Sequence, residues 1–148
     1  EALRQSLRDA AEGIAAAMEA CDLMAASTRF ISLSGELNLY VNDTAPWALA
    51  KAGDASRLDQ VLCQSLEGIR QLAILAYAFM PASSLAILAA LGEPVDGPPA
   101  WASLSAGGLP AGRVLSAPPI LFPKLDPEVL GLAVGKAGDE DADKGTGS

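Results

Sequence analysis

A tryptophan and a lysine near the start of a short helix are the residues of this chain best suited to binding chemistry. Trp47 follows Pro46 in residues 38–51 (NLYVNDTAPWALAK), and Lys51 lies about one helical turn further on. An exposed indole can stack on an unpaired base for roughly 1–3 kcal/mol, and an ammonium one turn away can meet a phosphate. The alternative is that the indole packs against the second and fourth predicted helices. The residue types alone favour this packing alternative.

Catalytic chemistry has little support in the sequence, because the chain contains no histidine. This excludes Ser-His-Asp and Cys-His nucleophiles and the usual proton shuttle near neutral pH. The carboxylates are scattered and form no acid–base pair, so we expect no catalytic, cofactor-binding or metal site. Cys21 and Cys63 form no CxxC motif, and we expect two reduced, buried residues of a cytosolic protein.

The charge of the chain limits how it could bind nucleic acid. The net charge is -8, of which residues 136–148 contribute -2, so residues 1–135 still carry -6. A surface of this charge argues against broad, nonspecific binding to phosphates. Any RNA contact must therefore be local and must rest on aromatic or hydrogen-bonding groups.

The apolar periodicity predicts an all-α fold, a helical bundle of about five helices. A first helix is expected over residues 2–20, and Asp22 is expected to cap a second helix that reaches Tyr40. Asp43 or Thr44 is expected to cap a short third helix with Pro46 in its first turn.

The break at Gly53 and Asp54 predicts a new cap and a long fourth helix to about residue 79. A fifth helix follows Pro81 and stops at Gly92. The apolar face expected for the first part of the fourth helix consists of Leu58, Leu62, Leu66, Ile69 and Ala73.

Three regions follow from the change in composition along the chain. Residues 1–92 form the predicted bundle, residues 93–135 an extended Pro- and Gly-rich strap packed on it, and residues 136–148 a disordered acidic tail. The expected anchors of the strap are its larger apolar residues, Trp101, Leu104, Leu109, Val114, Leu121 and Phe122.

Residues 72–92 contain no charged side chain, so a membrane hairpin is an alternative for this part of the chain. Pro81 and two serines interrupt the segment, and no basic cluster flanks it. The amphipathic helices elsewhere need an apolar partner, which favours a buried core helix and a protein without a membrane span.

At three places the sequence resembles the anticodon-binding domain of methionyl-tRNA synthetases, a class I family. The likeness covers about residues 1–126, and its most specific parts are the Pro46-Trp47 turn and the segment at 119–125. The three elements, in their order, are Asn38-x-Tyr40-Val41 leading to Ala45-Pro46-Trp47-x-Leu49-Ala50-Lys51, then Phe79-Met80-Pro81 with Leu91-Gly92, and Pro119-Ile120-Leu121-Phe122-Pro123-Lys124-Leu125.

The resemblance implies a bundle that binds the anticodon loop of methionine tRNA, with Trp47 as the aromatic surface and Lys51 beside it. It further implies a cytoplasmic methionine–tRNA ligase of which this chain is a C-terminal, non-catalytic fragment. The parent enzyme would use ATP, with zinc as an optional second cofactor, and the fragment would use neither. Its partners would be methionine tRNA and the catalytic domain.

The chain departs from the family pattern in ways that keep other functions open. The family's Asn-x-x-x-Arg anticodon-reading pair has no match in residues 1–37, and Leu39 stands at a position that is often basic. The nucleotide-binding signatures are missing too. One alternative is a non-catalytic helical interaction module derived from a synthetase. Another is the anticodon-binding domain of a different class I synthetase.

Overall fold

The computed structural model of the chain describes residues 2–104, 108–110, 112–118 and 120–124. Within these ranges the secondary structure is five α-helices and one short 3-10 helix, without a strand, which confirms the predicted all-α fold. The helices are α1 (Ala2–Glu19), α2 (Leu23–Thr44), α3 (Pro46–Ala52), α4 (Ala55–Ala76), α5 (Pro81–Ala90) and η1 (Trp101–Leu104).

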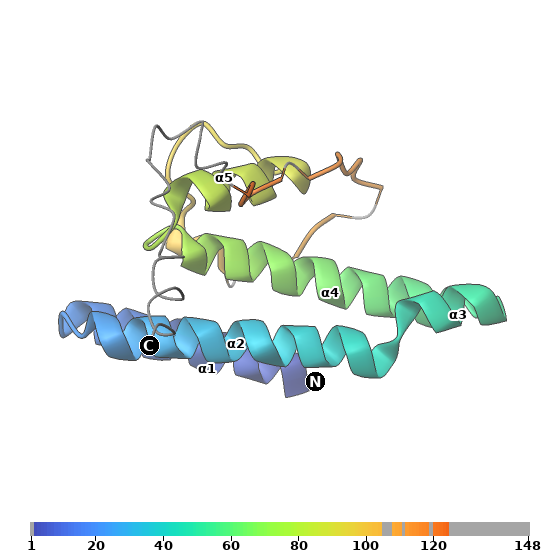
Figure 1. The fold of residues 1–148 in the computed structure, drawn as a ribbon, viewed down its shortest axis with the longest axis horizontal. Coiled ribbons are helices and arrows are strands. Elements are labelled where there is room, and N and C mark those ends of the chain that lie inside the picture. Colours follow the sequence, from blue (N-terminus) through green and yellow to red (C-terminus); the bar gives the residue numbers. More distant parts are fainter. Residues whose placement is uncertain (1, 105–107, 111, 119, 125–148) are drawn as a thin grey trace, which may run out of the picture.

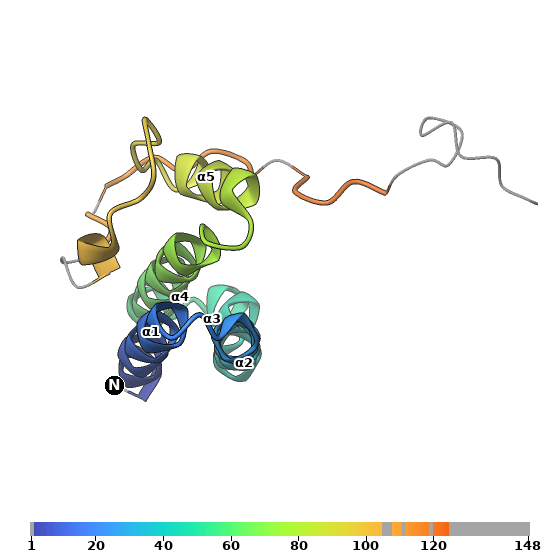
Figure 2. The ribbon, with the colours of Figure 1, turned by 90° about the vertical axis from the view of Figure 1, so that its left-hand side faces the viewer.

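The three long helices form the body of the molecule. α1 and α2 lie along one another, α4 packs on both, and α5 covers the far side of α4 (Figure 1). Seen along the bundle, α1, α2 and α4 form a three-helix group with α5 above it (Figure 2). The short helix α3 extends from the end of α2 and contacts α4.

The main core lies between α1, α2 and α4. Ile14, Leu33 and Leu75 bring one fully buried side chain from each of these helices to it. α2 and α4 approach closely at Gly68, where an added Cβ would lie 2.7 Å from Cδ1 of the buried Leu37. A larger residue at this position would therefore require the Leu37 side chain to move.

The apolar face predicted for α4 is partly wrong. Leu62 is 40% exposed, whereas Val61 and Ser65 are buried. Ser65 satisfies its hydroxyl within the helix by donating to the Val61 carbonyl oxygen over 2.8 Å. Because small and polar residues also face the core of α4, counting only the large apolar residues placed the buried face about one residue away from its true position.

The predicted helix caps at Asp22 and Asp54 are confirmed. The Asp22 carboxylate accepts a hydrogen bond from the Ala25 N–H over 2.9 Å, and Asp54 accepts from Arg57 over 3.1 Å. Cys21, by contrast, is exposed rather than buried, because α1 ends before it and its φ of 57° places it in the turn. Cys63 is exposed as well, so the expectation of two buried cysteines is wrong, although both are free thiols.

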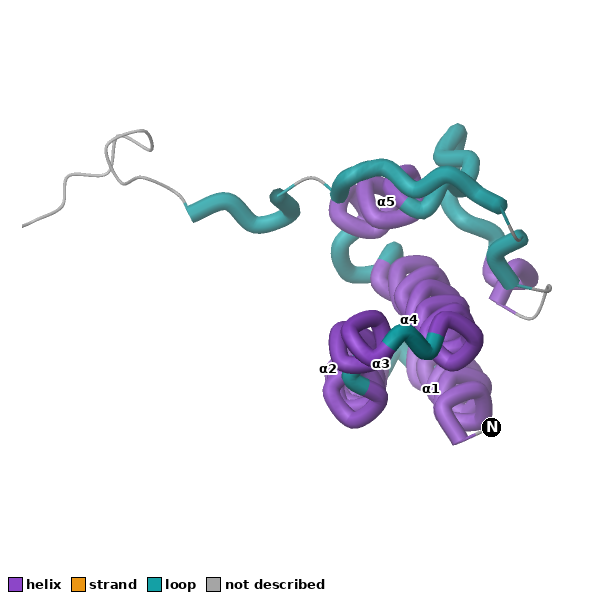
Figure 3. Tube along the Cα trace, turned by 90° about the vertical axis from the view of Figure 1, so that its right-hand side faces the viewer, coloured by secondary structure: helices purple, strands orange, loops and turns teal. Residues whose placement is uncertain are grey.

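The chain beyond α5 is held by a few polar contacts. α5 gives way to Gly92 in a left-handed conformation with φ of 74°, as expected for a helix stop. Arg113 then pairs with Glu93 at 2.6 Å, and the Ser116 N–H donates to the Ala90 carbonyl over 2.9 Å. Figure 3 shows this irregular segment passing over α5.

The predicted anchors of this segment are confirmed only in part. Leu104 packs against both the main core and a second cluster between α4 and α5, and Leu109 and Leu121 are half-buried. Trp101, Val114 and Phe122 are exposed, at 43%, 85% and 71%, so the prediction that they are buried anchors is wrong. The division at residues 92 and 135 stays a prediction, and residues 125–148, with the predicted tail, lie outside the described residues.

The uncharged stretch that raised the membrane alternative supplies core residues. Ala73 and Ile74 of α4 pack against Leu88 of α5, and the buried Ser84 hydroxyl donates to the Ala73 carbonyl over 2.6 Å. None of the described helices combines the length and the apolar character that a membrane span needs.

Candidate nucleic-acid interface

A single residue in the left-handed conformation separates α2 from α3. Ala45 has φ of 41° and ψ of 63°, and its N–H donates to the Val41 carbonyl over 3.0 Å, which closes α2. Pro46 then takes the first position of α3, where its missing N–H costs nothing. The next residue is Trp47, so the backbone turn places this residue at the start of α3.

The predicted cap of the third helix is wrong. α2 continues through Asp43 and Thr44, and no side chain caps α3. The Thr44 hydroxyl donates instead to the Tyr40 carbonyl one turn back, over 2.7 Å. This bond within α2 keeps Thr44 helical and leaves Ala45 to make the turn.

The end of α2 is tied to α4 by one hydrogen bond between side chains. The half-buried Tyr40 hydroxyl donates to Oε1 of the Gln64 side-chain amide over 2.5 Å. The Asn-x-Tyr element therefore has a structural role through its tyrosine, whereas Asn38 and Leu39 are exposed, the latter at 59%.

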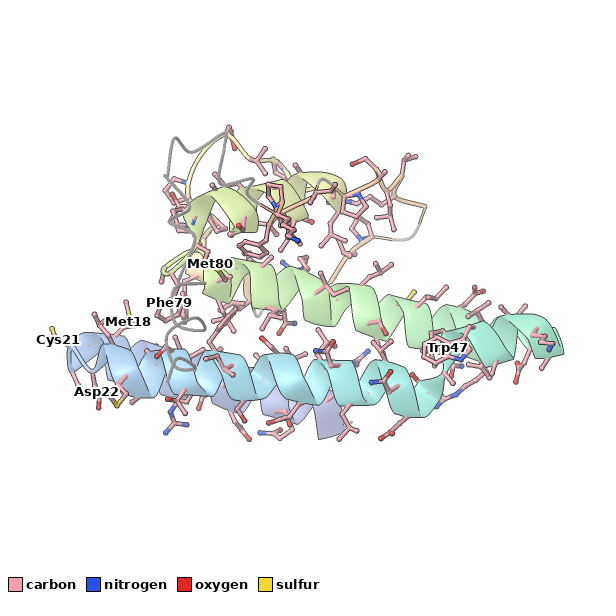
Figure 4. The ribbon with its side chains drawn as sticks, in the orientation of Figure 1. Met18, Cys21, Asp22, Trp47, Phe79 and Met80 are labelled. Carbon is pink, nitrogen blue, oxygen red and sulfur yellow. The ribbon has the colours of Figure 1, made fainter. Side chains whose placement is uncertain are left out.

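Trp47 is 60% exposed, so it is a surface residue rather than a buried residue of the core. Figure 4 places Trp47 at the α2–α3 junction, at the other end of the bundle from Cys21 and Phe79. An indole whose surface is mostly in water leaves a face free for a flat partner. Trp47 is thus accessible to a binding partner, and stacking of an RNA base on it stays a prediction.

Lys51 lies four residues after Trp47 on α3 and is exposed. Residues four apart on a helix lie on the same side, so positions 47 and 51 share one side of α3. Within the described part of the chain, ion pairs join only Glu67 to Arg70 and Glu93 to Arg113, which leaves Lys51 without a carboxylate partner. The predicted pair of an aromatic and a basic residue is therefore geometrically possible.

The described residues offer little for other chemistry. They contain no group of three or more His, Cys, Asp or Glu side chains that could hold a metal ion. The carboxylate with the most contacts is that of Glu67, and all of these contacts are hydrogen bonds that hold neighbouring parts of the chain together. The Arg70 guanidinium donates to it over 2.7 and 2.9 Å, and the Gln71 amide and the Leu109 N–H donate to it over 2.7 and 3.1 Å.

These contacts set the pKa of Glu67. Burial raises the pKa of this carboxyl, but the hydrogen bonds from Arg70, Gln71 and the Leu109 N–H and the Arg70 charge outweigh burial and lower it below the ordinary 4.5. Arg70 also donates to the Ser103 carbonyl over 2.9 Å, so the ion pair fastens the segment around η1 to α4. The sequence analysis missed this pair, although the Glu-x-x-Arg spacing inside an apolar helix was a signal for it.

A second feature that the sequence analysis missed is a groove of about 700 Å³ between α1, α4 and η1. Apolar residues of α1 line it at four-residue intervals, at Leu3, Leu7, Ala11 and Ala15. Trp101 and Cys63 line it from η1 and α4. The sequence carried a signal for this groove, because apolar residues recur every four positions along α1, beside the apolar face that the sequence analysis assigned to the core.

An all-α bundle with an exposed tryptophan on a proline-led turn is the arrangement that the sequence resemblance implied for a helical anticodon-binding domain. A family model described as the anticodon binding domain of methionyl tRNA ligase matches residues 1–131. The chain belongs to this family, which also answers the question of another class I specificity in favour of the methionyl branch.

Several curated methionine–tRNA ligases are similar to this chain. The chain is 30% identical to methionine–tRNA ligase 1 of Bacillus anthracis over 131 residues, which are 87% of this chain and 20% of that protein. It is 39% identical to the Porphyromonas gingivalis enzyme over 103 residues, 69% of this chain and 15% of that protein. The Streptococcus pyogenes serotype M1 enzyme is 35% identical over 114 residues, 75% and 17% respectively. The chain thus spans about a fifth of the length of these relatives.

Proposed function

We propose that this domain binds the anticodon loop of methionine tRNA and that Trp47 is the surface on which an anticodon base stacks. The observation that carries the proposal is the exposure of Trp47, 60%, on a turn fixed by Ala45 and Pro46 in a domain of this family. Lys51 would meet a neighbouring phosphate. Because the chain carries a net charge of -8, we expect weak, local binding rather than binding along the RNA backbone.

The activity of a whole ligase is part of the same proposal. We further propose a cytoplasmic polypeptide as long as the relatives, in which this domain would position the tRNA while other segments activate methionine with ATP and transfer it. The chain itself would then be non-catalytic and need no cofactor, and zinc, where present, would belong to those other segments. The lack of histidine in this chain is consistent with that division.

A direct test compares RNA binding by the chain and by Trp47→Ala. We expect the variant to bind an anticodon stem-loop with a CAU anticodon about 5- to 150-fold more weakly, the loss of one base stack worth roughly 1–3 kcal/mol. Fluorescence anisotropy of labelled RNA measures this loss. Trp101→Ala is the matched control, since it removes an exposed indole far along the chain, and it should leave the affinity unchanged. Equal loss in both variants would count against Trp47.

A second candidate function is a helical interaction module that no longer binds tRNA. The observation that favours it is the exposed Leu39 at a position often basic in the family, on a chain of net negative charge. The same titration distinguishes the two functions. The interaction module predicts no difference between the CAU stem-loop and one with a scrambled anticodon, even before any substitution.

A further inference from the structure

The side of α2 that is turned away from α1 and α4 is apolar for a surface helix. α2 lies at the edge of the three-helix group, so one of its sides faces solvent (Figure 2). Three large apolar side chains are exposed on α2, Met24 at 79%, Ile31 at 67% and Leu39 at 59%. They belong to the outer face of α2, which consists of Met24, Thr28, Ile31, Gly35, Leu39 and Asn42. Exposed apolar surface that continues along a helix marks an interaction site.

Charged residues are absent from the outer face of α2. The charged residues within the helix are Arg29, Glu36 and Asp43, which recur every seven positions and therefore lie along one flank. A solvent-facing helix side normally carries charge, and this chain has 10 basic and 18 acidic residues to supply it. A net charge of -8 opposes the approach of a second copy over most of the surface. The uncharged outer face is the place where that approach costs least.

The fold of a single chain does not require the glycine at position 35. Gly35 lies in the middle of α2, and it is not one of the described glycines with a left-handed backbone. A Cβ added to it would meet nothing within 4 Å. Glycine inside a helix costs about 0.5–1 kcal/mol relative to alanine. What the glycine provides is exposed backbone, which allows a second helix to approach closely, because the distance between packed helices depends on the side chains at their contact.

The spacing of the outer face is symmetric about Gly35. Ile31 and Leu39 lie four positions before and after it, and Thr28 and Asn42 lie seven positions before and after it. A two-fold axis at Gly35 would pair two antiparallel copies of α2, with each Ile31 opposite a Leu39 and each Thr28 opposite an Asn42. The apolar pairs would then lie beside the axis and the polar pairs outside them, as in an interface with an apolar centre and a polar rim.

We propose that two copies of this chain pair through the outer faces of their α2 helices, antiparallel and with Gly35 at the two-fold axis. A single helix from each copy buries less than the roughly 800 Å² per partner of a standard interface, so we expect a weak dimer with a dissociation constant in the micromolar range. The proposal goes beyond RNA binding by Trp47 and does not depend on it.

Disulfide cross-linking tests the register of the pair in a chain whose own thiols are removed by Cys21→Ser and Cys63→Ser. In that background Gly35→Cys should give a cross-linked dimer on oxidation, because position 35 meets itself at the axis. Ile31→Cys alone should not, because the two copies of position 31 would lie about 12 Å apart along the helices, beyond the Cα separation of about 7 Å that a disulfide spans. Ile31→Cys mixed with Leu39→Cys should cross-link.

A control for chance collisions keeps one natural thiol. Cys21→Ser leaves Cys63, which is exposed on α4 outside the outer face of α2. This protein should stay monomeric under the same oxidation.

Sedimentation equilibrium measures the affinity without a cross-link. Leu39→Glu should raise the dissociation constant about tenfold or more, since each dimer would bury two added carboxylates. Val114→Glu is the matched control, because Val114 is 85% exposed and lies beyond α5, and it should leave the dissociation constant unchanged. Circular dichroism checks that both variants keep their helices.

Four outcomes would overturn the proposal. The chain could remain monomeric at millimolar concentration. Ile31→Cys could cross-link to itself as readily as to Leu39→Cys, which would exclude the antiparallel register. Leu39→Glu and Val114→Glu could weaken the dimer equally, which would place the contact elsewhere. A dimer could also form only after addition of the stem-loop RNA, which would make RNA the partner of this face. The other assays contain no RNA, so their failure is distinguishable from failure of the Trp47 proposal.

Discussion

The two tryptophans of the chain lie in regions that are built in opposite ways. Trp47 stands on a turn fixed by backbone geometry, with Ala45 in a left-handed conformation and Pro46 opening α3. Trp101 opens the short 3-10 helix η1, which Arg70 of the Glu67–Arg70 ion pair fastens to α4 through the Ser103 carbonyl. Both indoles are exposed, at 60% and 43%.

The comparison shows that exposure alone does not define a function. The turn at Trp47 offers an isolated aromatic surface with one lysine nearby, which suits a single base. The indole of Trp101 instead lines a groove of mixed character, in which Arg4, Arg8 and Glu12 stand beside apolar residues of α1. Each surface takes its character from the neighbouring residues, and each can be disrupted without affecting the other.

The largest effect is expected from Arg70→Ala. The side chain of Arg70 is 4% exposed, and its loss leaves the Glu67 carboxylate and the Ser103 carbonyl without their partner. Because Glu67 keeps 21% of its side chain exposed, we expect the loss of unfolding free energy in urea melts to lie at the lower end of the range for a buried pair, about 3 kcal/mol. In the folded variant, acrylamide should quench Trp101 more strongly and Trp47 as before. Equal changes at both indoles would mean that the regions are not independent.

A smaller, pH-dependent effect is expected from Glu67→Gln. The pKa of Glu67 is lower in the folded chain than its ordinary 4.5, so its stabilising charge is fully present above that value and is lost as the pH falls through the folded pKa. The variant should be about 1.5–3 kcal/mol less stable at pH 7, the worth of hydrogen bonds to a charged group. Its deficit should shrink as the pH is lowered from about 5 to 3. A constant deficit in urea melts across this range would contradict a charged Glu67.

The smallest effect concerns the turn at Trp47. Ala45 tolerates φ of 41°, but a β-branched side chain is strained there, so Ala45→Val should cost about 1–2 kcal/mol. Ala45→Gly is the matched control, because glycine accepts this φ freely. The valine variant should also weaken binding to the CAU stem-loop, while the rate at which Cys63 in the groove between α1, α4 and η1 is alkylated stays unchanged. Unchanged RNA binding would show that the turn does not position the indole.

The sequence predicted the regular parts of this molecule well and the irregular parts poorly. Helix spans and the caps at Asp22 and Asp54 follow from local periodicity and capping chemistry, which act within a few residues. The exposure of Trp47 and Cys63 depends on how whole helices rotate against one another. The α4 face shows this, because Ser65 and Gly68 face the core where Leu62 was expected to do so. The fastening of Ser103 and Leu109 to α4 joins residues more than thirty positions apart, which no local pattern reveals.

The most direct test of the RNA proposal uses two proteins with one tryptophan each. Trp101→Phe keeps only Trp47, and Trp47→Phe keeps only Trp101. Both are titrated with the CAU anticodon stem-loop while their fluorescence is recorded. The proposal predicts saturable quenching in the protein that keeps Trp47 and none in the protein that keeps Trp101. Quenching confined to Trp101, or an unchanged Trp47 signal at saturating RNA, would contradict it.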